Sequence, residues 1–227
     1  MKRRINRRNQ KGAAIVEFSM VSVVMIPLLV GTAGYGVNMI RNLQTIQLAR
    51  DAGHMFARGA DFSQPGNKTI IASLGSDVGM TTNGSTSNAV VILSSLVYID
   101  KAMCAADGKV DASGNPLGCT NYTKWAFSRR LTIGDATMRT SNLGSPLQTG
   151  PNPVIVDAAT GAISVHDQVT NAGDVAVFTG INPYASVNGN VSGLPSGQVL
   201  YVSEAGAEGV RIPPFVPNSI MYSFNVF

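Results

Sequence analysis

Few residues of this chain are arranged for chemistry. Its two histidines, His54 and His166, are far apart in the sequence, and neither is accompanied by the Gly-x-Ser-x-Gly motif of a nucleophilic serine. Two His and two Cys among 227 residues also exclude most multi-ligand zinc sites. We therefore expect both histidines to face solvent or to lie in loops, and we expect no enzymatic activity, no catalytic residue, no metal site and no cofactor.

The two cysteines, Cys104 and Cys119, flank a segment with two turn signals, Asp107-Gly108 and Ser113-Gly114-Asn115. If this part of the chain lies outside the cytoplasm, the two thiols can oxidise. A disulfide that closes a loop of about 15 residues stabilises a fold by roughly 3 kcal/mol. We expect these cysteines to pair rather than to remain free thiols.

One acidic residue, Glu17, lies in an otherwise uncharged, mostly apolar stretch from Ala13 to Ile40. A carboxylate at the centre of a bilayer costs about 2.5–3.5 kcal/mol on insertion scales, and less near the interface. Glu17 is therefore either an interface residue without a role or a residue whose negative charge pairs with a positive group. The second interpretation depends on what precedes it.

The stretch around Glu17 is long enough to be a membrane anchor. No charged residue occurs from Phe18 to Ile40, and about 20 apolar residues suffice to span the hydrocarbon core. The stretch is longer than the roughly 7–15-residue core of a secretory signal peptide. Residues 1–12 contain six basic and no acidic residues, so the positive-inside rule predicts a cytoplasmic N-terminus. We expect a membrane span at about residues 18–40.

The net charge of +4 arises from that basic leader, because the rest of the chain has a small excess of acidic residues. Charged residues make up only 13% of the chain, about half the usual share in globular proteins. A protein that binds nucleic acid through a basic face needs more positive charge than this. We therefore expect membrane lipid, and no nucleic acid, among its partners.

The residues from Gly12 to Phe18, Gly-Ala-Ala-Ile-Val-Glu-Phe, resemble the processing site of type IV pilin-like proteins. The Glu-Phe ending is similar to the Tad (tight adherence, Flp-type) branch. The resemblance implies that a membrane prepilin peptidase cuts between Gly12 and Ala13. It also implies that Glu17, followed by Phe18, sets subunit register during assembly. A new amine at Ala13 and the Glu17 carboxylate would attract strongly in a low dielectric, where each charge alone is costly.

The segment from Ala49 to Gly59, Ala-Arg-Asp-Ala-Gly-His-Met-Phe-Ala-Arg-Gly, extends the resemblance. It is similar to the stretch that follows the membrane helix in TadE-like pseudopilins, although His54 stands where that family often has a small residue. The resemblance covers residues 9–60 and implies a TadE- or TadG-like minor pseudopilin. The implied partners are the prepilin peptidase, other pilin subunits and an inner-membrane assembly platform.

Apolar residues recur at spacings of three and four beyond the span, which predicts one helix from about Ala13 to about Gly59. Such a helix of about 46 residues is roughly 70 Å long, of which the bilayer covers about 30 Å. Its second half must therefore project from the membrane or pack on a head domain. Pro27 lies inside the apolar run and is expected to kink the helix.

The composition changes at Asp61–Asn67, where Pro65-Gly66 indicates a turn and a domain boundary. The expected organisation is a basic leader at 1–12, a long hydrophobic-then-amphipathic helix at 13–60, and a β-rich extracytoplasmic domain at 61–227. The fold class is α+β, with one antiparallel sheet packed on the helix. Candidate strands are Ala89–Ile99, Trp125–Ile133, Pro153–Val156, Asp174–Thr179, Gln198–Ser203 and Met221–Phe227, and Thr69–Leu74 is a candidate short helix.

The expected function is that of a structural minor pilin in the bacterial inner membrane, assembled through its helix into, or at the base or tip of, a Tad-type pilus. Its outer domain would be periplasmic first and then exposed on the pilus or cell surface, with a role in adhesion. The alternative is an uncleaved bitopic inner-membrane protein with a periplasmic binding domain, in which Glu17 has no role.

Overall fold

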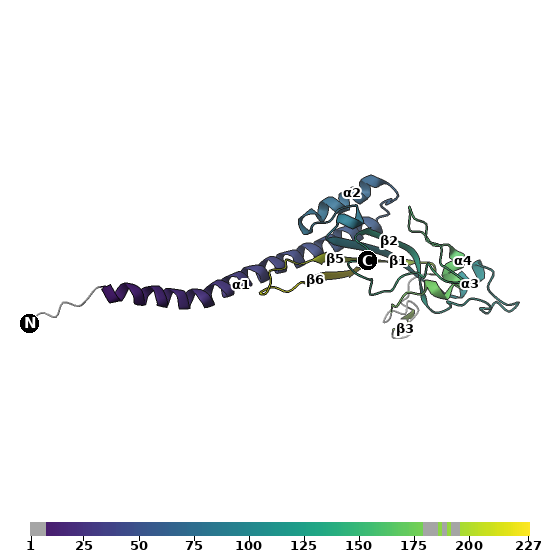
Figure 1. Cartoon of the computed structure of the whole chain (residues 1–227). Helices are drawn as coiled ribbons and strands as arrows, with labels where there is room; N and C mark the ends of the chain where they lie inside the picture. The colour runs from purple at the N-terminus through teal and green to yellow at the C-terminus, as the bar shows by residue number, and fades with distance from the viewer. Residues whose placement is uncertain (1–7, 179–185, 188–189, 192–195) are drawn as a thin grey trace, which may run out of the picture.

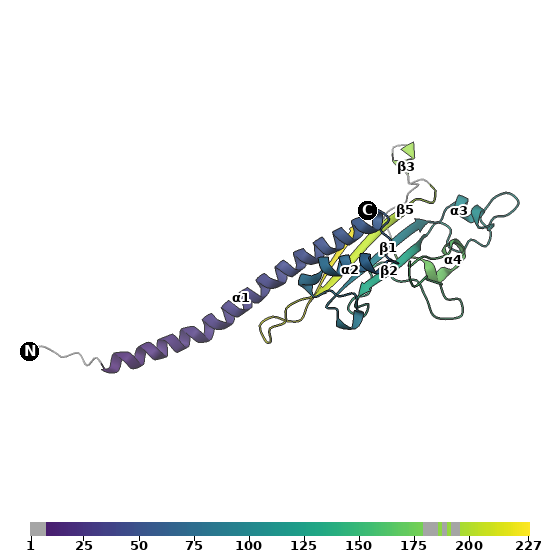
Figure 2. The same ribbon diagram turned by 90° about the horizontal axis from the view of Figure 1, so that it is seen from above.

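The computed structural model describes residues 8–178, 186–187, 190–191 and 196–227. Its largest element is the helix α1, Arg8–Ala57, which has 50 residues and is about 75 Å long. Figures 1 and 2 show that its N-terminal half extends away from the head domain, whereas its C-terminal half lies along the sheet. The expectation of one continuous helix that continues past the apolar run is confirmed.

The helix α1 continues through Pro27. Figure 2 shows the axis of α1 as a continuous curve. A sharp local kink at Pro27 stays a prediction. A proline inside a helix removes one backbone donor and one turn of hydrogen bonding. The hydroxyl of Thr32, just over one turn later, donates to the carbonyl oxygens of Leu28 and Leu29 at 2.9 and 3.0 Å.

The head domain is built on a four-stranded antiparallel sheet with strand order β2-β1-β5-β6. The α+β fold class and the antiparallel sheet packed on the helix are confirmed. The strands are β1 (Ala89–Tyr98), β2 (Trp125–Gly134), β5 (Val199–Glu208) and β6 (Ile220–Val226). A two-residue pair, β3 (Ser186–Val187) with β4 (Asn190–Val191), stands apart from this sheet.

The short helices lie at the two ends of the sheet (Figure 1). The helix α2 (Pro65–Leu74) begins at Pro65 and contains the candidate helical segment. The 3₁₀ turns η1 (Ser76–Val78) and η2 (Gly84–Thr86) precede β1. The helices α3 (Lys101–Ala106) and α4 (Val165–Thr170), with the 3₁₀ turn η3 (Ala172–Asp174), lie at the end farthest from the N-terminus of α1.

Two of the candidate strands are not strands in the structure. Residues 153–156 and 174–178 contribute only isolated bridges, Val156 to Ile163 and Val175 to Ala126, and Thr179 lies outside the described residues. Both segments are short and begin beside turn residues, so each is extended over too few residues to form a ladder. Their apolar side chains still contribute to the core, where Val154 and Ala176 are buried.

Each face of the sheet is covered by different elements. Leu48, Ala52 and Phe56 of α1 pack with Val91 and Leu93 of β1 in one core. On the opposite face, a second core is formed by strand residues and by side chains from the long segment between β2 and β5, namely Leu96, Trp125, Phe127, Leu143, Val154, Ile163, Ala176 and Val202. A bulge between Ser95 and Leu96 shifts the register of β1 against β2.

Candidate membrane and assembly site on the N-terminal helix

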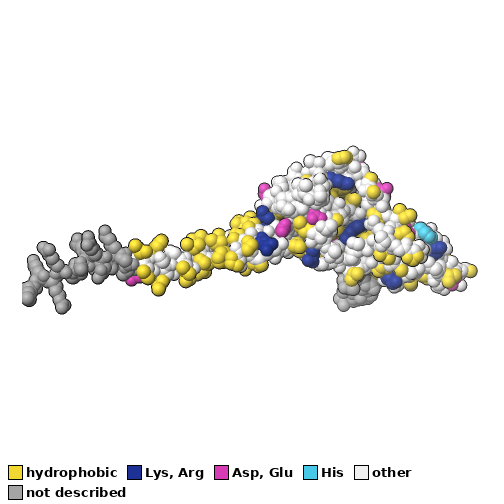
Figure 3. All heavy atoms as spheres, viewed as in Figure 1, with side chains coloured by type: hydrophobic (Ala, Val, Ile, Leu, Met, Phe, Trp, Pro, Cys, Tyr) yellow, Lys and Arg dark blue, Asp and Glu magenta, His cyan; other side chains and the backbone are white. Residues whose placement is uncertain are grey.

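The N-terminal half of α1 is apolar on all sides and exposed. Phe18 is 74% exposed and Val23 is 73% exposed, and none of the most apolar 18-residue window of the helix is buried. Figure 3 shows hydrophobic side chains along this half, with the basic and acidic side chains gathered mainly on the head domain. A helix that is hydrophobic all round is normally buried in protein or in lipid. By length and composition, α1 can therefore serve as a membrane anchor or a signal sequence.

The residues expected at the processing site all lie in α1. Gly12 and Ala13 are in its second turn, where the structure describes the helix but not side-chain exposure. Glu17 is exposed, and its carboxylate has no hydrogen-bond or ion-pair partner among the side chains described from residue 14 onward. Ala13 and Glu17 are four residues apart in α1, which is just over one helical turn.

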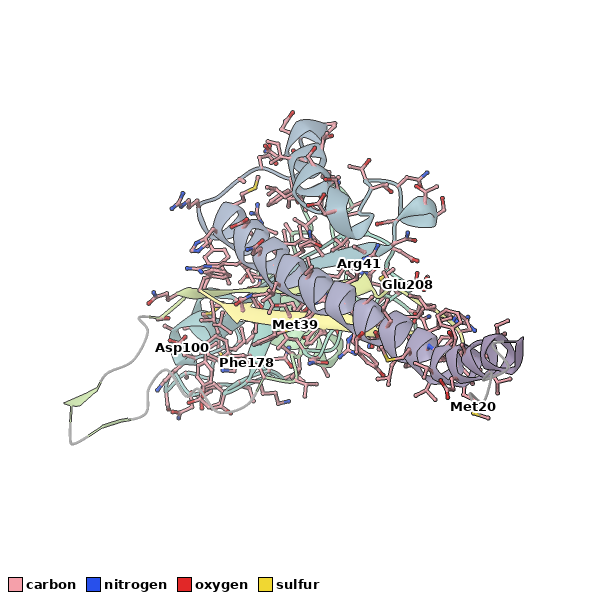
Figure 4. All side chains as sticks on the ribbon, turned by 90° about the vertical axis from the view of Figure 1, so that its left-hand side faces the viewer. Met20, Met39, Arg41, Asp100, Phe178 and Glu208 are labelled. Carbon is pink, nitrogen blue, oxygen red and sulfur yellow. A yellow bond between two sulfur atoms is a disulfide. The ribbon has the colours of Figure 1, made fainter. Side chains whose placement is uncertain are left out.

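A polar clamp joins α1 to the sheet where the apolar run ends. The Asn38 amide donates through Nδ2 to the Val210 carbonyl at 3.2 Å, and Asn38 Oδ1 accepts from the Val210 backbone N–H at 2.6 Å. One turn later, the Arg41 guanidinium donates to the Glu208 carbonyl at 2.9 Å. Figure 4 shows Arg41 and Glu208 beside each other, where β5 ends.

Two glycines let α1 approach the rest of the domain closely. A Cβ on Gly53 would overlap the ring of Phe227, which follows β6, and would come within 2.9 Å of Ser203 Cβ. A Cβ on Gly34 would overlap the side chain of Val216, in the loop between β5 and β6. The exposed ring of His54 stacks edge-on against Phe227, with centroids 4.7 Å apart. The clamp and these contacts fix the orientation of α1 relative to the head.

A disulfide joins Cys104 and Cys119 at the far end of the domain, as expected. Cys104 is buried in α3 with Val97 and Val169. Within the closed loop, Asp111 Oδ1 accepts from the backbone N–H groups of Ser113 and Asn115 at 2.9 and 2.7 Å. These bonds explain the turn at Ser113-Gly114-Asn115, and they leave the acidic side chain engaged with its own backbone.

His166 lies beside this loop and is exposed, as expected for both histidines. Its Nδ1 is 3.0 Å from Asp107 Oδ2, and its side chain is 62% exposed. A hollow of about 650 Å³ opens near it, lined in part by Leu147, Pro153 and Ile155. Within the part of the chain that the structure describes, no three His, Cys, Asp or Glu side chains converge to hold a metal ion.

A buried ionic network occupies the sheet face opposite α1. The Arg130 guanidinium of β2 lies with its Nη1 3.8 Å from Oε2 of Glu204 in β5, and the two side chains are 7% and 1% exposed. Glu204 accepts from the Ser141 hydroxyl, the Asn142 backbone N–H and the Tyr222 hydroxyl. Burial lowers the pKa of Arg130 to about 10, against the opposing effect of Glu204. Burial and the bond to Glu204 raise the pKa of Tyr222.

This network fastens the loop after β2 to the sheet. Arg130 also donates to Ser94 Oγ at 2.6 Å and to the Gly144 carbonyl at 3.0 Å. The guanidinium of Arg139 lies over the ring of Tyr222, 4.3 Å from its centroid. Because the charged groups are covered, a substrate does not reach them, and we assign them a structural role.

Asp174 is a second buried acid, in η3. Neither of its carboxylate oxygens has a hydrogen-bond partner among the described residues. Burial, with a smaller contribution from the charge of Asp167, raises the pKa of Asp174 to about 8. The group is therefore largely protonated at neutral pH, which removes most of the cost of an unpaired buried charge.

Sequence reasoning identified the apolar helix and the cysteine pair, but it missed the clamp residues Asn38 and Arg41. The roles assigned to Gly12 and Glu17 stay predictions. The signal of the clamp residues was available, because they are the first amide and the first cation after the basic leader. The pairing of Arg130 with Glu204 had no sequence signal, since residues on two non-adjacent strands are brought together only by the sheet.

No protein-family model, curated protein or solved structure matches this chain. The fold and the exposed helix therefore define its class: a long apolar N-terminal helix, able to act as an anchor or a signal, that carries a small α+β head domain.

Proposed function

We propose that the chain is a structural, pilin-like membrane subunit of the Tad type. In this proposal α1 spans the bacterial inner membrane with its N-terminus in the cytoplasm, and the head domain is periplasmic. The observation that carries the proposal is the free half of α1, an unburied apolar helix projecting from a head that clamps its other half. Such a helix needs lipid or neighbouring apolar helices around it.

The pilin assignment rests on the residues at the start of α1. Prepilin peptidase would cut after Gly12 and leave Ala13 as the new terminus. The charged amine would then lie one turn from Glu17, whose exposed carboxylate is otherwise unpaired among the side chains described from residue 14 onward. The same pair formed between neighbouring subunits would set the register of α1 against other pilin helices in the assembly platform and filament. The head domain would then be carried to the pilus or cell surface, where adhesion is its proposed role.

The alternative is an uncleaved bitopic protein with a periplasmic binding domain. The hollow near His166 and Ile155 favours it, because this opening lies at the end of the head farthest from the N-terminus of α1. In that case lipid alone covers the apolar helix, and Glu17 is an interface residue.

The mass of the chain isolated from its native host separates the two proposals. The pilin proposal expects a chain that begins at Ala13, and Gly12→Ser is expected to retain Met1 to Lys11 because the peptidase no longer has the flexible, side-chain-free glycine at its subsite. An intact leader in cells with active prepilin peptidase would contradict the proposal.

The role of Glu17 needs a separate variant. Glu17→Gln keeps the size of the side chain and removes its charge, so we expect leader removal to continue while co-purification with other pilin subunits falls. Asp51→Asn, an exposed substitution on the head-bound half of α1, is the matched control. Equal co-assembly of the two variants would show that the charge of Glu17 has no register function.

A further inference from the structure

The loop between β5 and β6 extends along the apolar half of α1. Its central segment, residues 212–217, reads Ile-Pro-Pro-Phe-Val-Pro and contains no polar side chain. Val216 is buried against Gly34 of α1, whereas Phe215 remains 38% exposed. Figures 1 and 2 show this loop reaching from the sheet toward the free end of the helix.

The position of this loop can be measured along the helix. If Glu17 marks the cytoplasmic edge of a hydrocarbon core about 30 Å thick, the outer edge falls about 20 residues later, near Val37. Gly34 then lies about 5 Å, and Gly31 about 9 Å, inside that edge. Phe215 shares a hollow of about 380 Å³ with Gly31 and Tyr35. The tip of the loop is therefore level with the outer part of the lipid.

The backbone of this segment is suited to such a position. Three of its six residues are prolines, which have no N–H to satisfy. Ile212 and Val216 donate to each other's carbonyls at 3.0 and 2.8 Å, and Phe215 donates to the Ile212 carbonyl at 2.8 Å. Every backbone N–H of residues 212–217 is thus either absent or hydrogen-bonded within the segment. Unpaired backbone N–H and C=O groups both disfavour irregular structure in the hydrocarbon core, and this segment avoids the cost of unpaired donors.

Polar residues stand on both sides of the apolar tip. Arg211 is exposed immediately before it, and Asn218 and Ser219 follow it. An arginine at this level can extend its guanidinium to lipid phosphates while its aliphatic part lies along the acyl chains. Tyr35, 60% exposed on α1, is at the same level, where interfacial aromatic residues concentrate.

We propose that the β5–β6 loop is a second membrane contact, in which Phe215 and its flanking prolines insert into the outer leaflet beside α1. The partner is the acyl-chain and headgroup boundary of the bilayer, and Arg211 binds its phosphates. The inference rests on the proposed membrane span of α1. A loop fastened to the clamp at Asn38 would set how deeply the helix inserts and hold the head at a fixed height above the lipid.

The test uses the full chain in vesicles of phosphatidylcholine and phosphatidylglycerol that contain brominated lipid, which quenches tryptophan fluorescence on contact. Three single variants are compared over the background of the buried native Trp125: Phe215→Trp in the loop, Leu29→Trp in the span and Leu147→Trp in the head. We expect lipid brominated near the headgroup to quench F215W about twofold more than lipid brominated near the chain end. This difference is expected because a side chain at the boundary between headgroups and acyl chains is inserted by only about 5–10 Å. L147W should not be quenched.

The two proposals fail in different ways. Quenching of L29W without quenching of F215W overturns the loop contact and leaves the membrane span standing. Absence of quenching in both overturns the span and the loop contact with it. Arg211→Trp provides a second loop position if F215W does not fold, and its quenching must then be confined to lipid brominated near the headgroup.

Discussion

Asn38 forms two hydrogen bonds with the backbone of Val210, one from its amide nitrogen at 3.2 Å and one to its amide oxygen at 2.6 Å. The side chain thereby pairs with the chain leaving β5 much as a neighbouring strand would. Because the two residues are 172 positions apart, this contact joins the end of the apolar run to the last part of the sheet.

Asn38→Ala is expected to destabilise the head by about 1–3 kcal/mol, since it leaves the partly buried N–H and C=O of Val210 without protein partners. The measurement is urea unfolding of the full chain in detergent, followed by the fluorescence of Trp125. Asn42→Ala, on the exposed face of the same helix, is the control and should change stability by much less. If both variants unfold alike, the clamp contributes nothing to the stability of the head.

Gly53→Ala is expected to destabilise the packing of α1 on the sheet by about 1–3 kcal/mol, although alanine is the better helix former. The new Cβ would overlap the ring of Phe227. A double-mutant cycle with Phe227→Ala tests the cause, because the cost of the methyl group should fall once the ring is removed. Gly66→Ala, in α2 with no atom near its Cβ position, is the control. A cost that is unchanged in the F227A background would assign the effect to another contact.

The limits of sequence reasoning follow from the range of the interactions involved. The apolar run that contains Glu17 and Phe18 could be identified from the sequence because hydropathy and charge are patterned locally along the chain, whereas the register function of the two residues stays a prediction. The four sheet strands could be predicted for a similar reason, since alternation and turn residues bound them. Gly53 could not be distinguished from any other helical glycine, because its role depends on Phe227 at the opposite end of the chain. The β5–β6 loop was missed for the same reason, since only the fold places Phe215 beside Gly31.

Asp174 makes the stability of the head depend on pH. Its pKa is about 8 in the fold against 3.8 as the ordinary value, so the folded state holds a proton that the unfolded chain releases. The stability linked to this proton is fully present below about pH 4 and is lost as the pH rises through about 8. Asp174→Asn, which does not ionise, is expected to lose less stability than the wild type between about pH 5 and pH 9.

Urea midpoints across that range measure the effect, with Asp51→Asn as an exposed control. A wild type and D174N with parallel pH profiles would mean that Asp174 does not hold its proton in the fold.

The Cys104–Cys119 disulfide closes a loop with a sequence separation of 15 and holds α3 against the buried side chains of Val97, Ala126 and Val169. Replacing both cysteines with serine is expected to lower the free energy of unfolding by roughly 3 kcal/mol, mainly because the unfolded chain regains the freedom of the open loop. Reduction of the wild type with dithiothreitol should produce a similar loss, whereas the same reductant should leave the double variant unchanged. A loss that acts through the unfolded chain lowers the protection of every amide that exchanges by global unfolding, so hydrogen exchange should quicken at Val97 and Ala126 and also at Leu48 and Phe56 on α1. Acceleration confined to Val97 and Ala126 would indicate instead that the disulfide supports only the distal end of the head as a local unit.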